Sequence, residues 1–292
     1  MTTFEAVLLG IVQGVFMFVP VSSTSHLALM QHWLIRRGSE LPAPESAEMI
    51  LFDLVVHVGT LVSIVIVLRH SMWGYCRGVV SEVRQSAAER RAPFRERLHL
   101  RLTLWGLLAV FVTGTVGLAL KDQFERVFAH PLAMAVTLTL TGILLWWTDT
   151  FTRLPRGLKQ LTPMVAIVVG LAQAFALIPG LSRSGMTIAF GLITGLKRRW
   201  AAEFSLFIAF PTIIAATGVQ ALGVLRDDAE VSITLWPLAV GFLVAAAVGT
   251  AALTLVLRLL YSARFRYFSY YVWLLAAAVV IWHFIGSVPV PP

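Results

Sequence analysis

Two segments of the chain carry the same polar pattern inside otherwise apolar sequence. The matched positions pair Gly10 with Gly170, Gln13 with Gln173, Ser22 with Ser182, and Thr24 with Ser184. A second match lies downstream, where the block 52–60 corresponds to the block 204–212. Hydrophobic segments that are interrupted at corresponding places in two halves are typical of membrane proteins built from a duplicated unit, with the binding site between the copies.

The composition of the chain is that of an integral membrane protein. Hydrophobic residues make up 58% of the 292 residues and charged residues only 13%, with a mean hydropathy of +0.82. Several apolar runs of roughly 17–25 residues are long enough to cross a bilayer as helices. We therefore predict an all-α integral membrane protein in which residues 1–292 form a single membrane domain. The single cysteine, Cys76, excludes an internal disulfide and a cysteine-based metal cluster.

The apolar runs predict six full spans and two broken segments. The broken segments, residues 4–35 and 164–196, contain too much Pro, Ser and Gly to be simple spans. Each is expected to enter the membrane and return on the same side as a re-entrant pair of half-helices, because irregular backbone at that depth needs a protein or watery surrounding. The full spans are expected at residues 50–68, 101–120, 130–148, 202–225, 233–257 and 268–287.

The positive charges are divided unequally between the two sides of this layout. Seventeen of the 23 Lys and Arg residues fall on one side and five on the other, and Arg183 lies within the second broken segment. Because basic loops remain in the cytoplasm, both termini are expected outside. The net charge of +8 then reflects membrane orientation and attraction to anionic lipids, so no nucleic-acid partner is expected.

The same layout predicts an inverted repeat. The first repeat, 1–148, and the second, 149–292, each contain three full spans, so the second copy is turned over relative to the first. The two broken segments then enter from opposite faces and can meet near the middle of the membrane. This arrangement places a polar site in the interior of the membrane domain.

Arg183 determines what such a site would bind. A guanidinium within the bilayer is costly and rarely lacks a partner. A glycine-containing turn that runs into a helix N-terminus offers free N–H groups to an anion, and arginine matches phosphate oxygens with two parallel donors. The hydroxyl groups that accompany it come from Ser182, Ser184 and Thr187 on one side and from Ser22, Ser23 and Thr24, with His26, on the other. We predict a pocket for a phosphorylated headgroup whose tail stays in lipid.

Four motifs make the chain similar to a known family. They are Pro20 to His26 (PVSSTSH), Phe52-Asp53 with Gly59, Gln173 to Thr187 (QAFALIPGLSRSGMT), and Ala201 to Ser205 before Pro211. With these the chain resembles the undecaprenyl-diphosphatases of the bacitracin-resistance type. These enzymes of the bacterial inner membrane remove one phosphate from the C55 isoprenoid diphosphate and so recycle the cell-wall lipid carrier. The resemblance implies an inverted-repeat bundle with two re-entrant helix pairs and a site that opens to the outer side.

The resemblance also implies roles for individual residues. Ser23 corresponds to the proposed nucleophile or its neighbour, His26 to a histidine that assists proton transfer or binds phosphate, and Arg183 to the phosphate clamp. Ser182, Ser184, Thr187, Ser22 and Thr24 would bind phosphate, and Gln13, Met17, Gln173 and Asp53 would line the site. The chemistry is consistent with these residue types, because phosphoryl transfer depends mainly on positioning and on charge stabilisation, and a neutral histidine can activate a serine.

Met17 departs from the family pattern, which has Glu at this position. A thioether can neither bind a hard cation nor act as a base. Three interpretations follow: His26 alone is the base, another carboxylate such as Asp53 substitutes, or the protein has lost hydrolysis and binds or moves a polyprenyl phosphate. Inverted-repeat architecture is shared with transporters, so the fold does not choose between them.

Cofactor and partners follow from the same residues. No two histidines have the i, i+4 spacing of a helical metal site, so a tightly bound transition metal is not expected. A divalent cation, Mg²⁺ or Ca²⁺, would be bridged by the phosphates of the substrate. His57 lies within a predicted span and could line the cavity, although a packed and hydrogen-bonded histidine is the expectation. The expected partners are a polyprenyl diphosphate and the bilayer, and a homodimer is a compatible assembly.

Overall fold

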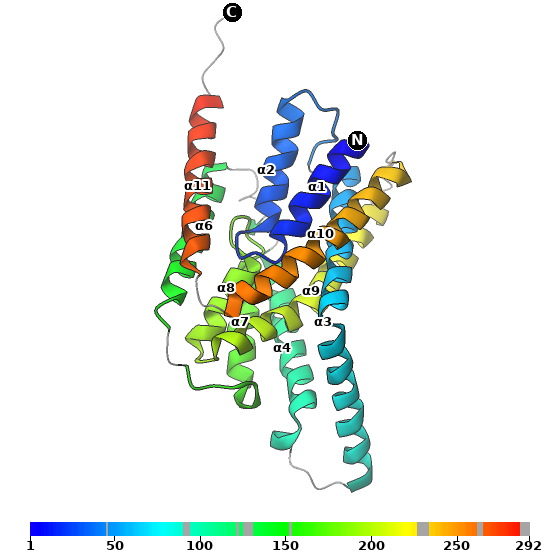
Figure 1. Cartoon of the computed structure of the whole chain (residues 1–292), viewed down its shortest axis with the longest axis vertical. Coiled ribbons are helices and arrows are strands. Elements are labelled where there is room, and N and C mark those ends of the chain that lie inside the picture. The colour runs from blue at the N-terminus through cyan, green and yellow to red at the C-terminus, as the bar shows by residue number, and fades with distance from the viewer. Residues whose placement is uncertain are drawn as a thin grey trace, which may run out of the picture.

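The computed structural model describes residues 1–44, 46–89, 94–120, 123–124, 131–151, 154–226, 234–261 and 265–286. Within these ranges the chain forms α-helices and short 3₁₀ turns, which confirms the all-helical prediction (Figure 1). The helices are α1 (Thr3–Phe16), α2 (Ser23–Arg36), α3 (Ala47–Glu89), α4 (Leu98–Ala119), α6 (Pro131–Thr148), α7 (Pro163–Phe175), α8 (Arg183–Ile193), α9 (Arg198–Arg226), α10 (Leu235–Tyr261) and α11 (Arg266–Gly286).

Each predicted broken segment consists of two short helices that pack on each other, α1 with α2 and α7 with α8. Local sequence sets where they begin. Helix α1 begins with a capping box, in which Thr2 and Glu5 satisfy each other's backbone N–H groups. Helix α7 begins with Thr162 as N-cap and Pro163 at the first helical position. The loops that separate the half-helices contain Pro20 in the first segment and the Pro179-Gly180 pair in the second.

Within the described residues, five helices are long and apolar enough to cross a membrane: α3, α4, α9, α10 and α11. Helix α6 is shorter, with an apolar run of Leu132–Thr148, so the predicted count of six full spans stays a prediction. The predicted span ends at residues 130, 233 and 287 lie outside the described residues. The described part of the chain thus has the helices of a multi-pass membrane protein.

Helix α3 is much longer than predicted. The predicted span ended at residue 68, with a basic loop after it, but the helix continues to Glu89, so this boundary was wrong. Residues such as Arg, Gln, Ala and Glu favour helix as strongly as many apolar residues. The extension also packs on α4: the Tyr75 hydroxyl bonds Thr103, and the Glu82 carboxylate accepts hydrogen bonds from the backbone N–H groups of His99 and Leu100.

Close helix packing surrounds the first helix of each broken segment. Helix α1 packs on α10, and α7 packs on α4. A Cβ atom added to Gly14 would lie 2.9 Å from the backbone nitrogen of Gly249 on α10, and one added to Gly170 would lie 2.6 Å from the Ala109 carbonyl oxygen on α4. In the predicted repeat, α1 corresponds to α7 and α10 corresponds to α4. The packing of α1 on α10 is therefore the counterpart of the packing of α7 on α4.

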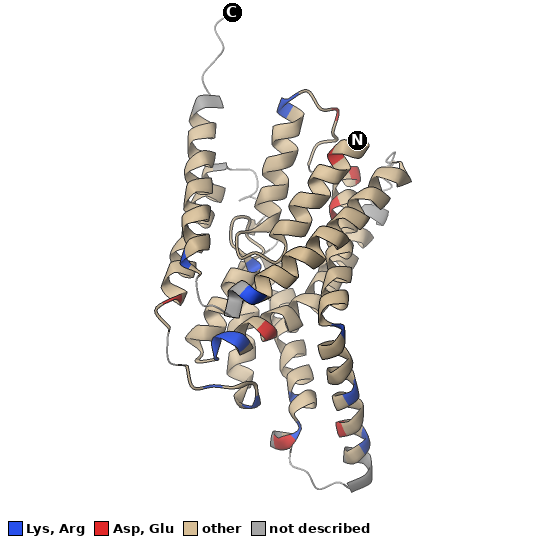
Figure 2. Ribbon diagram, in the orientation of Figure 1, with Lys and Arg blue, Asp and Glu red and all other residues tan. Residues whose placement is uncertain are grey.

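The charged residues are arranged along the long axis of the molecule (Figure 2). Lys and Arg gather toward the end where the later turns of α3 approach α4, at the bottom of the view. The N-terminus and the last turns of α11 lie at the opposite end. Arg36 and Arg37, at the end of α2, are exceptions on that side.

Candidate active site

Met17 lies where the two broken segments meet. Its sulfur atom is 3.4 Å from Nε2 of Gln13 and 3.9 Å from Oγ of Ser23. The same sulfur is 3.9 Å from a guanidinium nitrogen of Arg183 on α8. Three residues of the first broken segment and the arginine of the second therefore share one contact point. We call this group, with Ser184 and His57, the headgroup site.

The N-terminus of α2 presents Ser23 to this site. Its N-cap residue, Ser22, has a φ angle of 68°, in the left-handed region, and its side chain caps no backbone N–H group. The Ser22 hydroxyl instead bonds the Ser25 hydroxyl at 2.9 Å and lies 3.4 Å from that of Thr24. The first N–H groups of α2 thus have no capping side chain, and such groups bind anions well.

Burial separates the two serines of this motif. Ser22 is buried, whereas Ser23 is partly exposed and Thr24 is exposed. Only a hydroxyl that a ligand can reach can attack it or bind it. Of the two serines, Ser23 is therefore the one that a ligand can reach, and the Ser22 and Ser25 hydroxyls bond each other within the turn.

The N-terminus of α8 is fixed more firmly. Oγ of Ser182 accepts a hydrogen bond of 3.2 Å from the Gly185 N–H, and the Ser182 N–H donates to Thr141 on α6 at 3.2 Å. The Thr187 hydroxyl donates to the Arg183 carbonyl oxygen at 2.8 Å and pairs with the hydroxyl of Ser205 at 2.5 Å. Ser182 and Thr187, two of the residues predicted to bind phosphate, therefore make hydrogen bonds within the protein, with the Ser182 oxygen as an acceptor.

The partly exposed side chains at the start of α8 are Arg183 and Ser184. Helix α6 anchors the loop before them, because Thr141 donates to the Gly180 carbonyl oxygen at 2.8 Å and Thr137 donates to that of Pro179 at 2.5 Å. The loop is thus held from outside the broken segment, and Arg183 projects from a fixed backbone.

His26 is held by two hydrogen bonds and a stacked ring. Its Nδ1 lies 2.7 Å from the Ser22 carbonyl oxygen, and its Nε2 lies 2.8 Å from the Tyr271 hydroxyl on α11. The ring of Phe16 stacks on it with centroids 3.9 Å apart. Tyr271 was not among the predicted site residues, and no local signal in the sequence marks it.

Asp53 and His57 lie one turn apart on α3. The Gln31 amide donates to Oδ1 of Asp53 at 3.0 Å, and Nδ1 of His57 bonds the Asp53 carbonyl oxygen at 2.7 Å. His57 also interacts electrostatically with Arg183. The sequence predicted a packed and hydrogen-bonded His57. Its Nδ1 has the expected hydrogen bond, but the side chain is only partly buried.

Gln13 and Gln173 match in sequence but have different surroundings. Gln13 donates to Met17, within the headgroup site. Gln173 donates to the hydroxyls of Thr113 at 3.1 Å and Thr212 at 2.9 Å, which belong to α4 and α9. The contacts of Gln173 therefore join helices of the bundle and include none of the first motif.

The headgroup site offers few ligands for a hard cation. Its oxygen donors are the Ser23 and Ser184 hydroxyls and the buried Oε1 of Gln13, which has no hydrogen-bond partner. Among the described residues, no group of three or more His, Cys, Asp and Glu could hold a metal ion. Mg²⁺ and Ca²⁺ prefer carboxylate-rich oxygen sets, so these side chains do not by themselves fit either ion.

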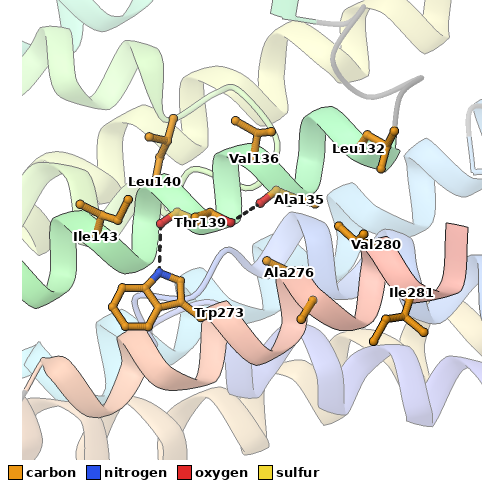
Figure 3. A pocket seen from close by; sticks show the side chains of 11 residues that line it. Leu132, Ala135, Val136, Thr139, Leu140, Ile143, Trp273, Ala276, Val280 and Ile281 are labelled. Atoms are coloured by element: carbon orange, nitrogen blue, oxygen red, sulfur yellow. Dashed lines mark hydrogen bonds between the residues drawn. The ribbon is translucent and has the colours of Figure 1, made fainter. Parts of the chain in front are cut away.

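An apolar groove lies elsewhere, between α6 and α11 (Figure 3). Its volume is about 810 Å³, and one hydrogen bond, from Trp273 Nε1 to the Thr139 carbonyl oxygen at 3.2 Å, crosses it. Its lining comprises Leu132, Ala135, Val136, Thr139, Leu140, Ile143, Trp273, Ala276, Ala277, Val280 and Ile281. None of the predicted site residues lines the groove, so it is separate from the headgroup site.

Membrane-length helices, two broken helix pairs and an arginine-serine site between them define a multi-pass helical membrane protein with a polar interior site. Residues 6–278 match the family described as Bacitracin resistance protein BacA, and the chain belongs to this family. It is 55% identical over 279 residues to the undecaprenyl-diphosphatase of Alkalilimnicola ehrlichii, with 96% of both chains covered. It is 54% identical to that of Halorhodospira halophila, over 96% of this chain and 98% of the relative. The undecaprenyl-diphosphatase of Carboxydothermus hydrogenoformans is 33% identical over 282 residues, covering 96% of this chain and 97% of the relative.

Proposed function

We propose that the protein hydrolyses undecaprenyl diphosphate to undecaprenyl phosphate and inorganic phosphate, and so recycles the lipid carrier of cell-wall synthesis. The relatives that cover nearly the whole chain carry the name of this activity. The single structural observation that supports it most is the contact of Ser23 and Arg183 with the same Met17 sulfur. A nucleophilic hydroxyl and a phosphate-binding guanidinium then flank one space.

In this proposal the Ser23 oxygen attacks the terminal phosphorus, and Arg183 pairs with its non-bridging oxygens. The uncapped N–H groups at the start of α2 stabilise the charge that develops there. Ser184 and Thr24 are exposed enough to donate further hydrogen bonds to phosphate. Ser22, Ser182 and Thr187 act indirectly, because their hydroxyls hold the two helix N-termini in place.

A divalent cation, if the reaction uses one, would be carried by the oxygens of the diphosphate. This follows from the poor fit of the protein donors around Met17, where a thioether occupies the position of a carboxylate in the family pattern. A cation held mainly by substrate oxygens would bind the free protein weakly. Calorimetric titration of the protein with Mg²⁺ or Ca²⁺ tests this, because strong binding without lipid would contradict it.

The protein is expected to lie in the bacterial inner membrane with both termini outside and the headgroup site open to the outer side. The gathering of Lys and Arg at the end opposite the N-terminus supports this orientation (Figure 2). Labelling of a cysteine placed at Ser39, in the turn after α2, by an impermeant reagent in intact cells tests it. Protection of that cysteine would contradict the orientation.

A second function is favoured by Met17 alone. Without the family carboxylate the protein could bind or translocate a polyprenyl phosphate and hydrolyse nothing. Phosphate release from polyprenyl diphosphate by the purified protein distinguishes the two functions, measured with chelator, with Mg²⁺ and with Ca²⁺.

Ser23→Ala is the variant that tests the hydrolytic site, and Ser71→Ala, at an exposed position on α3, is its matched control. We expect release by the wild type and by Ser71→Ala, and its loss in Ser23→Ala. Retained binding of a labelled polyprenyl phosphate with no release by the wild type would favour the carrier function.

A further inference from the structure

Two histidines near the headgroup site have the same tautomer. Nδ1 of His26 and Nδ1 of His57 each lie 2.7 Å from the backbone carbonyl oxygen four residues earlier, that of Ser22 and that of Asp53. A carbonyl oxygen only accepts, so Nδ1 carries the proton in both neutral rings. In both rings, Nε2 is then the atom with the free lone pair, and the partners of Nε2 decide which ring can accept a proton.

Nε2 of His26 is already occupied. It accepts a hydrogen bond of 2.8 Å from the Tyr271 hydroxyl, and the buried ring stacks on that of Phe16. To take a proton from Ser23, His26 would have to give up this bond and leave the stack. These contacts assign His26 to holding the turn that precedes α2.

Nε2 of His57 has no hydrogen-bond partner among the described residues, and the side chain is only partly buried. Asp53, one turn earlier, bonds α2 through Gln31, and Leu61, one turn later, belongs to the cluster that contains Met17 and Phe18. His57 lies between these two contacts on the same helix face. His57 also interacts electrostatically with Arg183, the residue proposed to bind phosphate.

We propose that His57 is the general base of the headgroup site, and that its Nε2 accepts the proton of the Ser23 hydroxyl directly or through one water. This inference rests on the proposed hydrolysis. It explains how the chain can work with Met17 where the family has a carboxylate. It also gives Asp53 a positioning role, because the Asp53 carbonyl oxygen fixes the tautomer and orientation of the ring.

The proton transfers balance over two steps. In the first, the Ser23 oxygen bonds the terminal phosphorus, the bridging P–O bond breaks with its electrons going to undecaprenyl phosphate, and the Ser23 proton moves to His57. In the second, water adds to phosphorus and the bond from phosphorus to the Ser23 oxygen breaks. Ser23 regains the proton from His57, and inorganic phosphate leaves with both protons of the water.

The test compares kcat and KM for phosphate release from polyprenyl diphosphate. His57→Gln keeps a polar side chain but cannot accept the proton, so we expect kcat to fall about a hundredfold. KM and binding of a labelled polyprenyl phosphate should stay near the wild-type values, which a merely structural defect would not allow. His70→Gln, at an exposed position on the same helix, is the matched control and should behave as wild type.

A second variant adds a readout that is specific for a base. His57→Ala leaves a space for imidazole, and added imidazole should restore part of kcat, whereas it should not restore His26→Ala. Wild-type kcat in His57→Gln, or rescue by imidazole in His26→Ala and not in His57→Ala, would overturn the assignment. Absence of release by the wild type would overturn the proposed function and this inference together.

Discussion

The sulfur atom of Met17 lies 3.9 Å from a guanidinium nitrogen of Arg183, although 166 residues separate the two in the sequence. A thioether is a weak acceptor and carries no charge, so it cannot neutralise the guanidinium. The contact with Met17 therefore leaves the guanidinium charge available to an anionic ligand. The contact also marks the point at which the two broken segments meet.

Replacing Met17 with Glu should raise cation-dependent phosphate release by about tenfold or more, because the new carboxylate would lie beside Ser23 and could hold a cation or accept a proton. The measurement is kcat with and without Mg²⁺ or Ca²⁺. Met17→Gln is the matched control, because glutamine has nearly the same shape as glutamate but carries no charge. An equal change in both variants would show that polarity, and not the carboxylate, is responsible.

Arg183→Lys should lower kcat/KM by about a hundredfold, because lysine keeps the charge but loses the two parallel donors. Binding of a labelled polyprenyl phosphate should weaken while the yield of folded protein stays similar. The control is Arg156→Lys, an exposed arginine whose guanidinium bonds the Thr194 carbonyl oxygen outside the site. Unchanged lipid binding in Arg183→Lys would assign Arg183 a structural role.

Gly14→Ala should destabilise the protein by about 1–3 kcal/mol, because overpacking at a helix contact forces the backbones apart. The added Cβ would lie 2.9 Å from both the Gly249 nitrogen and the Val248 Cβ atom. Gly114→Ala is the control, since a Cβ there meets nothing within 4 Å. Thermal unfolding in detergent measures both, and equal Tm values would contradict the close packing of α1 on α10.

Asp149→Asn should lower stability by about 2 kcal/mol, the usual worth of hydrogen bonds to a charged group. This carboxylate is 4% exposed and accepts from the Phe265 and Arg266 backbone N–H groups at 3.2 and 3.1 Å, at the start of α11. Arg198 also pairs with it. Glu203→Gln, which breaks the more exposed pair with Arg199, should change Tm much less. A similar fall in Tm in both variants would show that the buried contacts of Asp149 stabilise the protein no more than the exposed ion pair of Glu203.

The sequence by itself determined the class of fold and the position of its breaks. Apolar runs of membrane length, and the Pro, Ser and Gly residues that interrupt two of them, act locally, so the helices and the two half-helix pairs could be predicted. The end of α3 could not, because its basic half is helical through favourable propensity and through Tyr75 and Glu82 contacts with α4. The motifs likewise identified Ser23 and Arg183 as candidate site residues.

Only the tertiary structure decided which of the candidate side chains face the site. Gln13 and Gln173 are equivalent in the sequence, yet one bonds Met17 and the other bonds Thr113 and Thr212. His26 belongs to the more conspicuous motif, but its Nε2 bonds Tyr271, 245 residues away, whereas Nε2 of His57 on α3 has no hydrogen-bond partner among the described residues. The free atoms of a polar side chain depend on which distant helices pack against it, and a local pattern does not contain that information.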